Sequence, residues 1–274
     1  MKKLFLTLIS LVFLSCKQGY GLYEIFGRAD SVRERATGIT KLEHLSLPKN
    51  YTFALITDVH FGAKKSRDVD KSFFAWLQGL KAEGTLPKFI VCLGDVAEHG
   101  NEDEFLQYNN FVSKIKNDFA LETFTILGNH DLYKSGYRFW KKLIFPHTSF
   151  YVFETNAFSF YFLDNANGSF SPAQYFALAK IFSSDKNPKL CFAHIPLYAD
   201  GIFFASMQDT RERNLVLSQF AKSKVKAFFA GHTHRTRTSV FRFPEYTIPG
   251  FLEKEAWALV SVDEARDEVK VMYE

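Results

Sequence analysis

The stretch FTILGNHDLY, residues 124–133, is apolar for most of its first half and then changes to Gly128, Asn129, His130 and Asp131. The apolar part is typical of a short buried strand. A Gly-Asn pair is also a common turn signal, and a single histidine after a strand is often an ordinary loop residue. The stretch alone therefore leaves two interpretations open, a turn or a site, and the rest of the chain decides between them.

Short apolar runs of strand length recur along the chain, and each is followed by polar residues. Besides the quoted stretch they are YTFALITD (51–58), KFIVCLGD (88–95), FSFYFLDN (158–165), KLCFAHIP (189–196) and KAFFAGHTH (226–234). Apolar residues with helical spacing lie between several of these runs, at 69–80, at 105–115 and after Ser171, which we expect to cap a helix with Pro172 at its first position. Strands that alternate with helices predict α/β layering.

The C-terminal part of the chain differs, because YTIPGF, AWALVSVDE and EVKVMYE follow one another with turns between them. This pattern predicts antiparallel hairpins. We therefore expect an α/β fold with a pair of sheets covered by helices. A chain of 274 residues, 47% of them hydrophobic, can bury such a core, and its 31 phenylalanines are expected to fill core and strand positions.

Polar residues with metal-binding chemistry follow five of the predicted strands. They are Asp58-Val59-His60, Gly94-Asp95, Gly128-Asn129-His130-Asp131, His194 and Gly231-His232-Thr233-His234. Because ligands of open α/β sheets bind beyond the carboxyl ends of the strands, we expect these residues to converge. Carboxylate and amide oxygens combined with imidazole nitrogens suit divalent transition metals such as Mn, Fe or Zn. The glycines before three of these groups allow the chain to turn tightly.

The order and spacing of these motifs, D-x-H, G-D, G-N-H-D, H and G-H-x-H, resemble the calcineurin-like metallophosphoesterase family from residue 51 to about 250. The resemblance implies a two-sheet β-sandwich flanked by helices, in an α/β/β/α arrangement. It also implies two divalent metal ions. The implied ligands are Asp58, His60 and His234 for one ion, Asn129, His194 and His232 for the other, and Asp95 as a bridge between them.

The same resemblance implies hydrolysis of a small phosphate mono- or diester. Two metal ions about 3.5–4 Å apart share a hydroxide that attacks phosphorus. His130 lies one residue beyond the implied ligand Asn129, and it is the expected proton donor to the leaving oxygen. The short motif GDVAEHG is more similar to cyclic-nucleotide phosphodiesterases and small phosphatases than to protein phosphatases. The alternative is an exported lipoprotein of the same fold that binds a partner or a metal without turnover.

Glu98 stands three residues after Asp95, where protein phosphatases of the family carry an aspartate paired with the catalytic histidine. Two interpretations remain open for it. Glu98 either orients His130 and favours its charged imidazolium form, or it is a solvated loop acid. Purple acid phosphatases carry a tyrosine at this position and lack the histidine of the first motif, so Glu98 and His60 argue against a tyrosinate-bound ferric site.

Several other polar residues have open roles. His99 either reaches the substrate or is an exposed loop residue, and Asp164 either supports the site or forms a turn. Arg211 and Arg213 either bind a second phosphate or belong to the solvated start of a helix. Two histidines lie outside every motif and are expected at structural or surface positions, His44 and His147.

The N-terminus has the layout of a secretory signal, since Met1-Lys2-Lys3 precede an apolar run at residues 4–14 and then Ser15-Cys16. The run is shorter than the roughly 20 residues that span a bilayer. We expect residues 1–15 to be a signal peptide, 16–48 a lipidated Cys16 and tether, and 49–274 the metallophosphoesterase domain. Acyl chains on Cys16 would make this an exported cell-envelope lipoprotein held at a membrane surface. A plain cleaved signal with an incidental cysteine is the alternative.

Charge and the remaining cysteines limit the other possibilities. The formal charge of +4 comes from scattered lysine and arginine residues, which argues against nucleic acid as a structural partner. Cys92 and Cys191 lie in apolar runs, so they are expected to be buried thiols, although export would also permit a disulfide.

Overall fold

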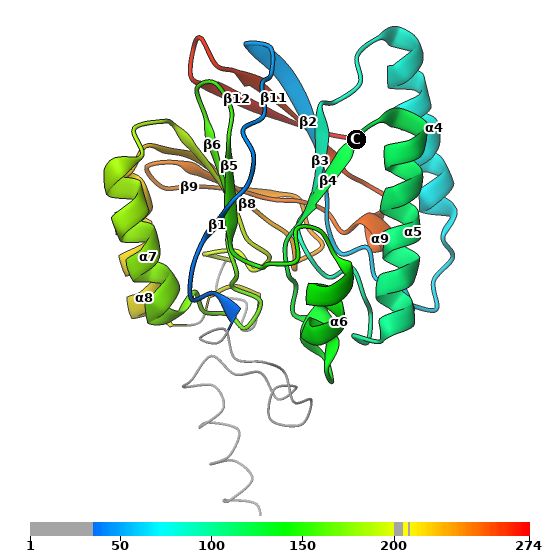
Figure 1. Ribbon diagram of the computed structural model, residues 1–274, viewed down its shortest axis with the longest axis horizontal. Coiled ribbons are helices and arrows are strands. Elements are labelled where there is room, and N and C mark those ends of the chain that lie inside the picture. Colours follow the sequence, from blue (N-terminus) through cyan, green and yellow to red (C-terminus); the bar gives the residue numbers. More distant parts are fainter. Residues whose placement is uncertain (1–34, 200–204, 208) are drawn as a thin grey trace, which may run out of the picture.

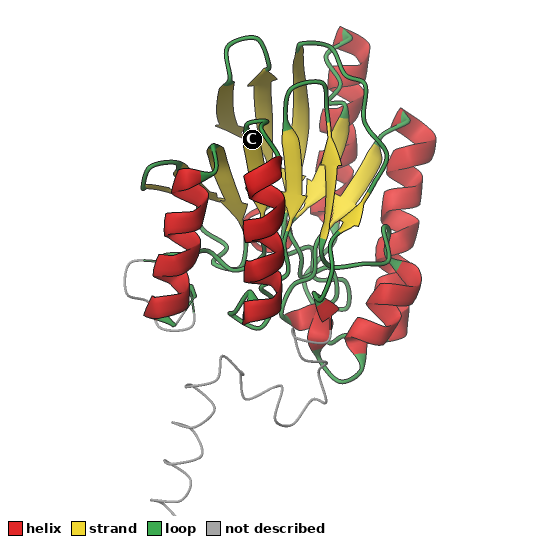
Figure 2. Ribbon diagram, turned by 60° about the vertical axis from the view of Figure 1, so that its left-hand side comes forward, coloured by secondary structure: helices red, strands yellow, loops and turns green. Residues whose placement is uncertain are grey.

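The computed structural model describes residues 35–199, 205–207 and 209–274. The predicted signal peptide and Cys16 lie outside the described residues. Two β-sheets pack face to face, and helices cover the outer side of each sheet (Figures 1 and 2). The predicted α/β fold, a two-sheet sandwich flanked by helices, is confirmed.

The first sheet has five strands in the order β12-β11-β2-β3-β4. Its strands are β2 (Asn50–Ile56), β3 (Phe89–Cys92), β4 (Glu122–Thr125), β11 (Ala258–Asp263) and β12 (Glu268–Tyr273). Strands β2, β3 and β4 run parallel, with Ala54 opposite Ile90 and Ile90 opposite Thr123. Strand β11 is antiparallel to both β2 and β12. The loops that follow β2, β3 and β4 therefore leave the same edge of this sheet.

The second sheet has seven strands in the order β1-β5-β6-β7-β8-β10-β9. Its strands are β1 (Thr40–Lys41), β5 (Tyr151–Glu154), β6 (Ser159–Phe162), β7 (Lys189–Phe192), β8 (Val225–Ala230), β9 (Arg237–Val240) and β10 (Pro244–Thr247). Strands β6, β7 and β8 run parallel, so the loops after β7 and β8 also leave one common edge.

The space between the sheets is filled largely by phenylalanine, as the composition predicted. Phe53 and Phe89 stack with ring centroids 5.0 Å apart, and Phe53 makes T-shaped contacts with Phe160, Phe192 and Phe229 of the opposite sheet. All five side chains are essentially inaccessible to solvent. Stacked and edge-to-face contacts of this kind add to the stabilisation that burial alone provides. This core holds the two sheets, and hence their strand ends, in a fixed relation.

Helices α4 (Asp68–Glu83) and α5 (Glu102–Phe119) cover the five-stranded sheet, and α6 (Gly136–Leu143) packs against α5 beyond the strand ends. Helices α7 (Ser171–Ser184) and α8 (Thr210–Lys222) cover the seven-stranded sheet (Figure 1). The helical spacing at 69–80, at 105–115 and after residue 171 is confirmed by α4, α5 and α7. The cap of α7 is Phe170 and not Ser171, which is already the first helical residue.

The C-terminal hairpin prediction is correct for β11 and β12 and wrong for YTIPGF. Strand β10 pairs with β8 in parallel and with β9 in an antiparallel ladder, so it belongs to the other sheet. The short helix α9 (Phe251–Lys254) then carries the chain across to β11. Strands β1, β5 and β9 were not predicted. Strand β1 has only two residues, too few to show a period of two in the sequence.

Residues 35–48, assigned to the tether from the sequence, lie against the domain. Strand β1 pairs with β5, Thr40 opposite Tyr151. Leu42, Leu45 and Leu47 pack on the core between the sheets. Isolated leucines without a regular period gave no indication of this packing in the sequence.

Cys92 and Cys191 are both free thiols and both fully buried. Burial raises the pKa of the Cys92 thiol to about 12 and raises that of Cys191 further. The interpretation as buried thiols is confirmed. Among the residues that the structure describes, no helix is both long and apolar enough to cross a membrane.

Candidate metal centre

The polar residues predicted at five strand ends come from both sheets and meet at one place. Asp58 and His60 follow β2, Asp95 follows β3, and the 3-10 turn η1 (His130–Leu132) places Asn129 and His130 after β4. His194 follows β7 of the other sheet, and His232 and His234 follow β8. Three groups of their ligand atoms lie close together, each with its atoms within 4.8 Å of one another. The structure thus brings all the residues predicted as ligands to a common region.

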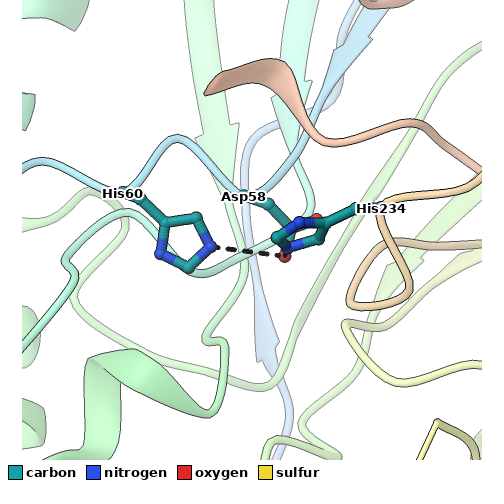
Figure 3. Close-up of side chains that lie close together, drawn as sticks. All are labelled: Asp58, His60 and His234. Carbon is teal, nitrogen blue, oxygen red and sulfur yellow. Dashed lines mark ion pairs between the residues drawn. The ribbon is translucent and has the colours of Figure 1, made fainter. Parts of the chain in front are cut away.

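The first cluster consists of Asp58, His60 and His234 (Figure 3). Asp58 Oδ2 accepts hydrogen bonds from Thr57 Oγ1 at 2.7 Å and from the backbone N–H of His232 at 3.1 Å. Asp58 Oδ1 is buried and has no hydrogen-bond partner. His234 Nε2 lies 3.1 Å from it and His60 Nε2 lies 3.9 Å from it. One carboxylate oxygen is therefore fixed by the protein, and the other faces two imidazoles.

The second cluster consists of Asp95, His194 and His232. His194 Nδ1 lies 2.7 Å from the carbonyl oxygen of Leu93, so it carries a hydrogen and donates it. His194 Nε2 then faces two acceptor oxygens, Asp95 Oδ2 at 3.2 Å and Asn129 Oδ1 at 3.0 Å. A nitrogen between two such oxygens requires either a proton or a cation. Asp95 Oδ1 accepts from the backbone N–H of His130, and the role of Asp95 as a bridge stays a prediction.

Electrostatic coupling joins the two clusters. Burial opposes ionisation of Asp95, but the imidazoles of His194 and His130 outweigh it and hold the pKa of this carboxyl well below its usual range. Burial likewise lowers the pKa of His194 and His234, while Asp95 and Asp58 outweigh it and raise both pKa values to about 9. These carboxylates therefore attract positive charge strongly, and a metal ion would replace the protons on the two imidazoles.

Five of the seven predicted ligands have a left-handed backbone conformation, which non-glycine residues rarely adopt. They are Asp58 (φ 55°), His60 (φ 50°), Asp95 (φ 51°), His232 (φ 66°) and His234 (φ 52°). Such conformations are unfavourable and are concentrated where the surrounding structure fixes a functional side chain. Gly128 shows how close the loops approach, since a Cβ there would lie 2.1 Å from both N and Oδ1 of Asp95.

His130 lies beside the first cluster. Its Nδ1 is 2.9 Å from the backbone carbonyl oxygen of Glu98, and its ring meets that of His60 edge-on at a centroid distance of 4.8 Å. Because Nδ1 donates to that carbonyl, Nε2 is the ring nitrogen that can exchange a proton. The predicted link between Glu98 and His130 is thus made by the main chain of Glu98.

The carboxylate of Glu98 lies close to two imidazoles, since one of its oxygens, one ring nitrogen of His60 and one ring nitrogen of His130 all lie within 4.8 Å of one another. Its Oε2 lies 2.9 Å from His60 Nδ1, although the angle is not that of a hydrogen bond. His60 itself is buried near the carboxylates of Asp58 and Asp95. Glu98 therefore contacts a predicted ligand directly, and its action on His130 through the side chain stays a prediction.

A sequence model of the calcineurin-like phosphoesterases matches residues 51–236, most of the described chain. The chain belongs to the calcineurin-like phosphoesterase family. A search of curated proteins found no significant match.

Solved structures with a similar fold agree with this family. A dimetal phosphatase from Danio rerio is 17% identical, with a TM-score of 0.61 over 77% of this chain and 92% of that one. A purple acid phosphatase from yellow lupin (Lupinus luteus) is 12% identical, with a TM-score of 0.60 over 85% of this chain and 54% of that one, so the chain spans about half of the lupin protein. GAP50, the anchor in the inner membrane complex of Plasmodium, is 15% identical, with a TM-score of 0.58 over 82% and 84%. At these identities the likeness establishes the fold alone.

The donor atoms of this phosphoesterase-family chain fit divalent cations. Asp58 Oδ1 is a buried oxygen without a hydrogen-bond partner, and His194 Nε2 is an imidazole nitrogen facing two oxygens. Mixed oxygen and nitrogen sets of this kind suit Mn, Fe or Zn.

Two supporting carboxylates were not predicted. Asp131 is fully buried, and its Oδ1 accepts from the backbone N–H groups of Val96 and Ala97, while its Oδ2 accepts from Gly128. Glu253 of α9 accepts a hydrogen bond from His234 Nδ1. Asp131 could have been noticed, because it stands in the same short motif as Asn129 and His130. Nothing in the sequence around Glu253 indicates its contact with a residue in another motif.

A third support is Asn165, which follows β6. Its Nδ2 donates to the carbonyl oxygen of Ile195 at 2.6 Å, and its Oδ1 accepts from the Ile195 N–H at 2.9 Å. These paired bonds fix the residue next to His194. The neighbouring Asp164 is fully buried and forms an ion pair with Arg35 at 2.9 Å, so it ties the start of the described chain to this loop.

The structure places the other candidate residues outside the two clusters. His99 is about half exposed and bonds Glu104 at 2.8 Å. Arg211 is exposed at the start of α8, whereas Arg213 donates to the carbonyl oxygen of Met207. His44 and His147 are surface residues, as predicted, with contacts to Asn156 and to the carbonyl oxygen of Lys141.

Proposed function

We propose that this member of the calcineurin-like phosphoesterase family hydrolyses small phosphate mono- or diesters with two divalent transition-metal ions. The observation that carries the proposal is the pair of adjacent clusters, each with a buried donor atom directed at its centre. The residues that would hold the ions are Asp58, His60 and His234 for one, Asn129, His194 and His232 for the other, and Asp95 between them.

Bound divalent cations would supply positive charge that polarises a phosphoryl group and lowers the pKa of water. The protein's own residues would supply the proton for the leaving group and orient its donor. His130 would hold a proton on Nε2 and deliver it to the leaving oxygen. The Glu98 carbonyl fixes the ring through Nδ1, and Asp95 Oδ1 fixes its backbone N–H, so the orientation of His130 is set from both ends.

The proposal is tested by measuring hydrolysis of p-nitrophenyl phosphate and bis-p-nitrophenyl phosphate by the purified chain. The reactions contain Mn²⁺, Zn²⁺ or a chelator, and the variants are Asp95→Asn and, as control, His44→Ala at an exposed histidine. We expect metal-dependent turnover that Asp95→Asn loses by at least about a thousandfold and His44→Ala retains. Metal-loaded, folded protein that hydrolyses neither ester would instead favour a binding protein without turnover. The ratio of monoester to diester turnover would identify the substrate class.

We also infer from the sequence that Cys16 carries acyl chains that hold the chain at a membrane surface of the cell envelope. The support is the order of charged, apolar and small residues before Cys16. Partition of the protein between detergent and aqueous phases tests this inference, with Cys16→Ser as the matched variant. A wild-type chain that partitions into the aqueous phase as completely as Cys16→Ser would exclude the anchor.

A further inference from the structure

Helix α9 is attached to the loops of the first cluster by its backbone. The N–H of Phe251 donates to the carbonyl oxygen of Thr57 at 2.8 Å, and the N–H of Leu252 donates to that of Asp58 at 3.4 Å. Gly250, the residue before α9, lies against the His234 ring, since a Cβ there would be 2.9 Å from His234 Cγ. The helix is therefore fixed relative to two of the three predicted ligands of this cluster.

The attachment of α9 places the side chain of Glu253 against His234. Its Oε2 accepts a hydrogen bond from His234 Nδ1, and its Oε1 accepts from Lys254 Nζ at 2.6 Å. Lys65 Nζ donates to the carbonyl oxygens of Leu252 at 2.8 Å and Glu253 at 2.9 Å, which fixes the end of the helix. With the hydrogen of His234 on Nδ1, the other nitrogen, Nε2, faces Asp58 Oδ1 at 3.1 Å as a ligand would.

Glu253 is a carboxylate placed directly behind the His234 ring, and its other oxygen accepts a hydrogen bond from the ammonium group of Lys254. An anionic hydrogen-bond acceptor behind a histidine ligand fixes its tautomer and raises its basicity toward a metal.

The two clusters differ in the group that faces Nδ1 of their histidines. In the first cluster His234 donates from Nδ1 to the carboxylate of Glu253, and the carboxylate of Glu98 lies 2.9 Å from His60 Nδ1 without hydrogen-bond geometry. In the second cluster His194 has the neutral carbonyl of Leu93 at the same position. Since the anionic partner is the stronger support, Glu253 should strengthen His234 as a ligand more than the Leu93 carbonyl strengthens His194.

We propose that Glu253 is a positioning residue that acts through His234 to raise the cation affinity of the first cluster, with a smaller effect on the second cluster. The proposal rests on the metal binding included in the proposed function, and it does not depend on turnover.

The test is calorimetric titration of the metal-free full chain with Zn²⁺ and with Mn²⁺. The variants are Glu253→Gln and the matched control Glu255→Gln, an exposed glutamate next to α9 that pairs with Lys65 at 3.6 Å. We expect the wild-type chain to bind two equivalents. Glu253→Gln should weaken one of them by about 10- to 100-fold and change the other by less. Glu255→Gln should match the wild type, and circular dichroism should show that all variants are folded.

The same titration in a chain that carries His234→Ala shows whether Glu253 acts through His234. His234→Ala should lose the same equivalent, and adding Glu253→Gln to it should cause no further loss. The proposal is overturned if Glu253→Gln changes neither equivalent or both equally, if Glu255→Gln has the same effect, or if the losses in the double variant add. Wild-type chain that binds no metal would overturn this proposal and the proposed function together. If the wild-type chain binds two metal ions and turns over substrate, but Glu253→Gln weakens neither ion selectively, only the proposal for Glu253 is overturned.

Discussion

The carboxylate of Asp131 accepts a hydrogen bond from the backbone N–H of Val96 at 2.9 Å and so joins the loop after β4 to the loop after β3. The same side chain also bonds the N–H groups of Ala97 and Gly128. Burial and the nearby Asp95 raise the pKa of Asp131 to about 7, and the backbone bonds oppose this rise. Three buried N–H groups thus have the Asp131 side chain as their hydrogen-bond acceptor, and these bonds fix the two loops of the site relative to each other.

Replacing Asp131 by alanine should lower the free energy of unfolding by roughly 3 kcal/mol or more, because each buried donor left unpaired costs about 1–3 kcal/mol. Asp131→Asn should lose less, since its amide keeps one acceptor oxygen. Urea unfolding followed by circular dichroism measures both. Asp118→Ala at an exposed site should stay within about 0.5 kcal/mol of the wild type. An Asp131→Ala chain as stable as this control would contradict the structural role.

Adding a methyl group at Gly128 should disrupt the site, since its Cβ would lie 2.1 Å from the backbone and carboxylate of Asp95. We expect Gly128→Ala to lower the thermal unfolding temperature and reduce the number of bound metal ions. Gly79 in α4 is the control because a Cβ there meets nothing within 4 Å. Gly79→Ala should stabilise the chain by about 1 kcal/mol, since alanine favours a helix interior. Equal metal binding by both variants would show that the close contact does not matter.

The role of His130 as proton donor predicts a dependence on the leaving group. His130→Ala should slow hydrolysis of phenyl phosphate by about 10² to 10⁴-fold. The loss with p-nitrophenyl phosphate should be much smaller, because p-nitrophenolate leaves without a proton. The two rates are compared with those of His99→Ala, at a half-exposed histidine of the same region. Equal losses for both esters would assign His130 to binding instead of proton transfer.

Glu245 should make stability depend on pH. It is almost completely buried, and burial raises its pKa from 4.5 to about 7 against the opposing bonds from Leu197 and Tyr198. Between these values the folded chain retains a proton that the unfolded chain releases. The free energy of unfolding should therefore fall as the pH rises through this window, by up to about 3 kcal/mol. Urea unfolding of Glu245→Gln at pH 4.5 and pH 8 should lack this component, and parallel curves for the two proteins would contradict it.

The strand ends could be predicted because each combines two local signals, an apolar run and a polar group at its exit. Asp58, Asp95 and His194 all follow this rule, and the parallel strands bring them together. A family resemblance then gave the arrangement of the sheets. The short strand β1 and the parallel pairing of β10 with β8 could not be read in the same way, since these pairings depend on partners more distant in the sequence.

The supporting contacts could not be predicted for a different reason. Glu98 is close to two histidines. Only the three-dimensional packing determines that its carboxylate contacts His60 Nδ1 and that its backbone carbonyl accepts a hydrogen bond from His130 Nδ1. Glu253 meets His234 because α9 is fixed by backbone bonds to the loop after β2. Such contacts follow from how loops are positioned, and loop position has no periodic sequence pattern.

Cys92 and Cys191 lie in separate cores, one under α4 and α5 and the other under α7 and α8. Both sheets of the sandwich stand between these two cores, so the thiols cannot meet without unfolding the domain. A disulfide between these two thiols is therefore excluded in the folded domain. The described part of the chain should reach the same native state under reducing and oxidising conditions.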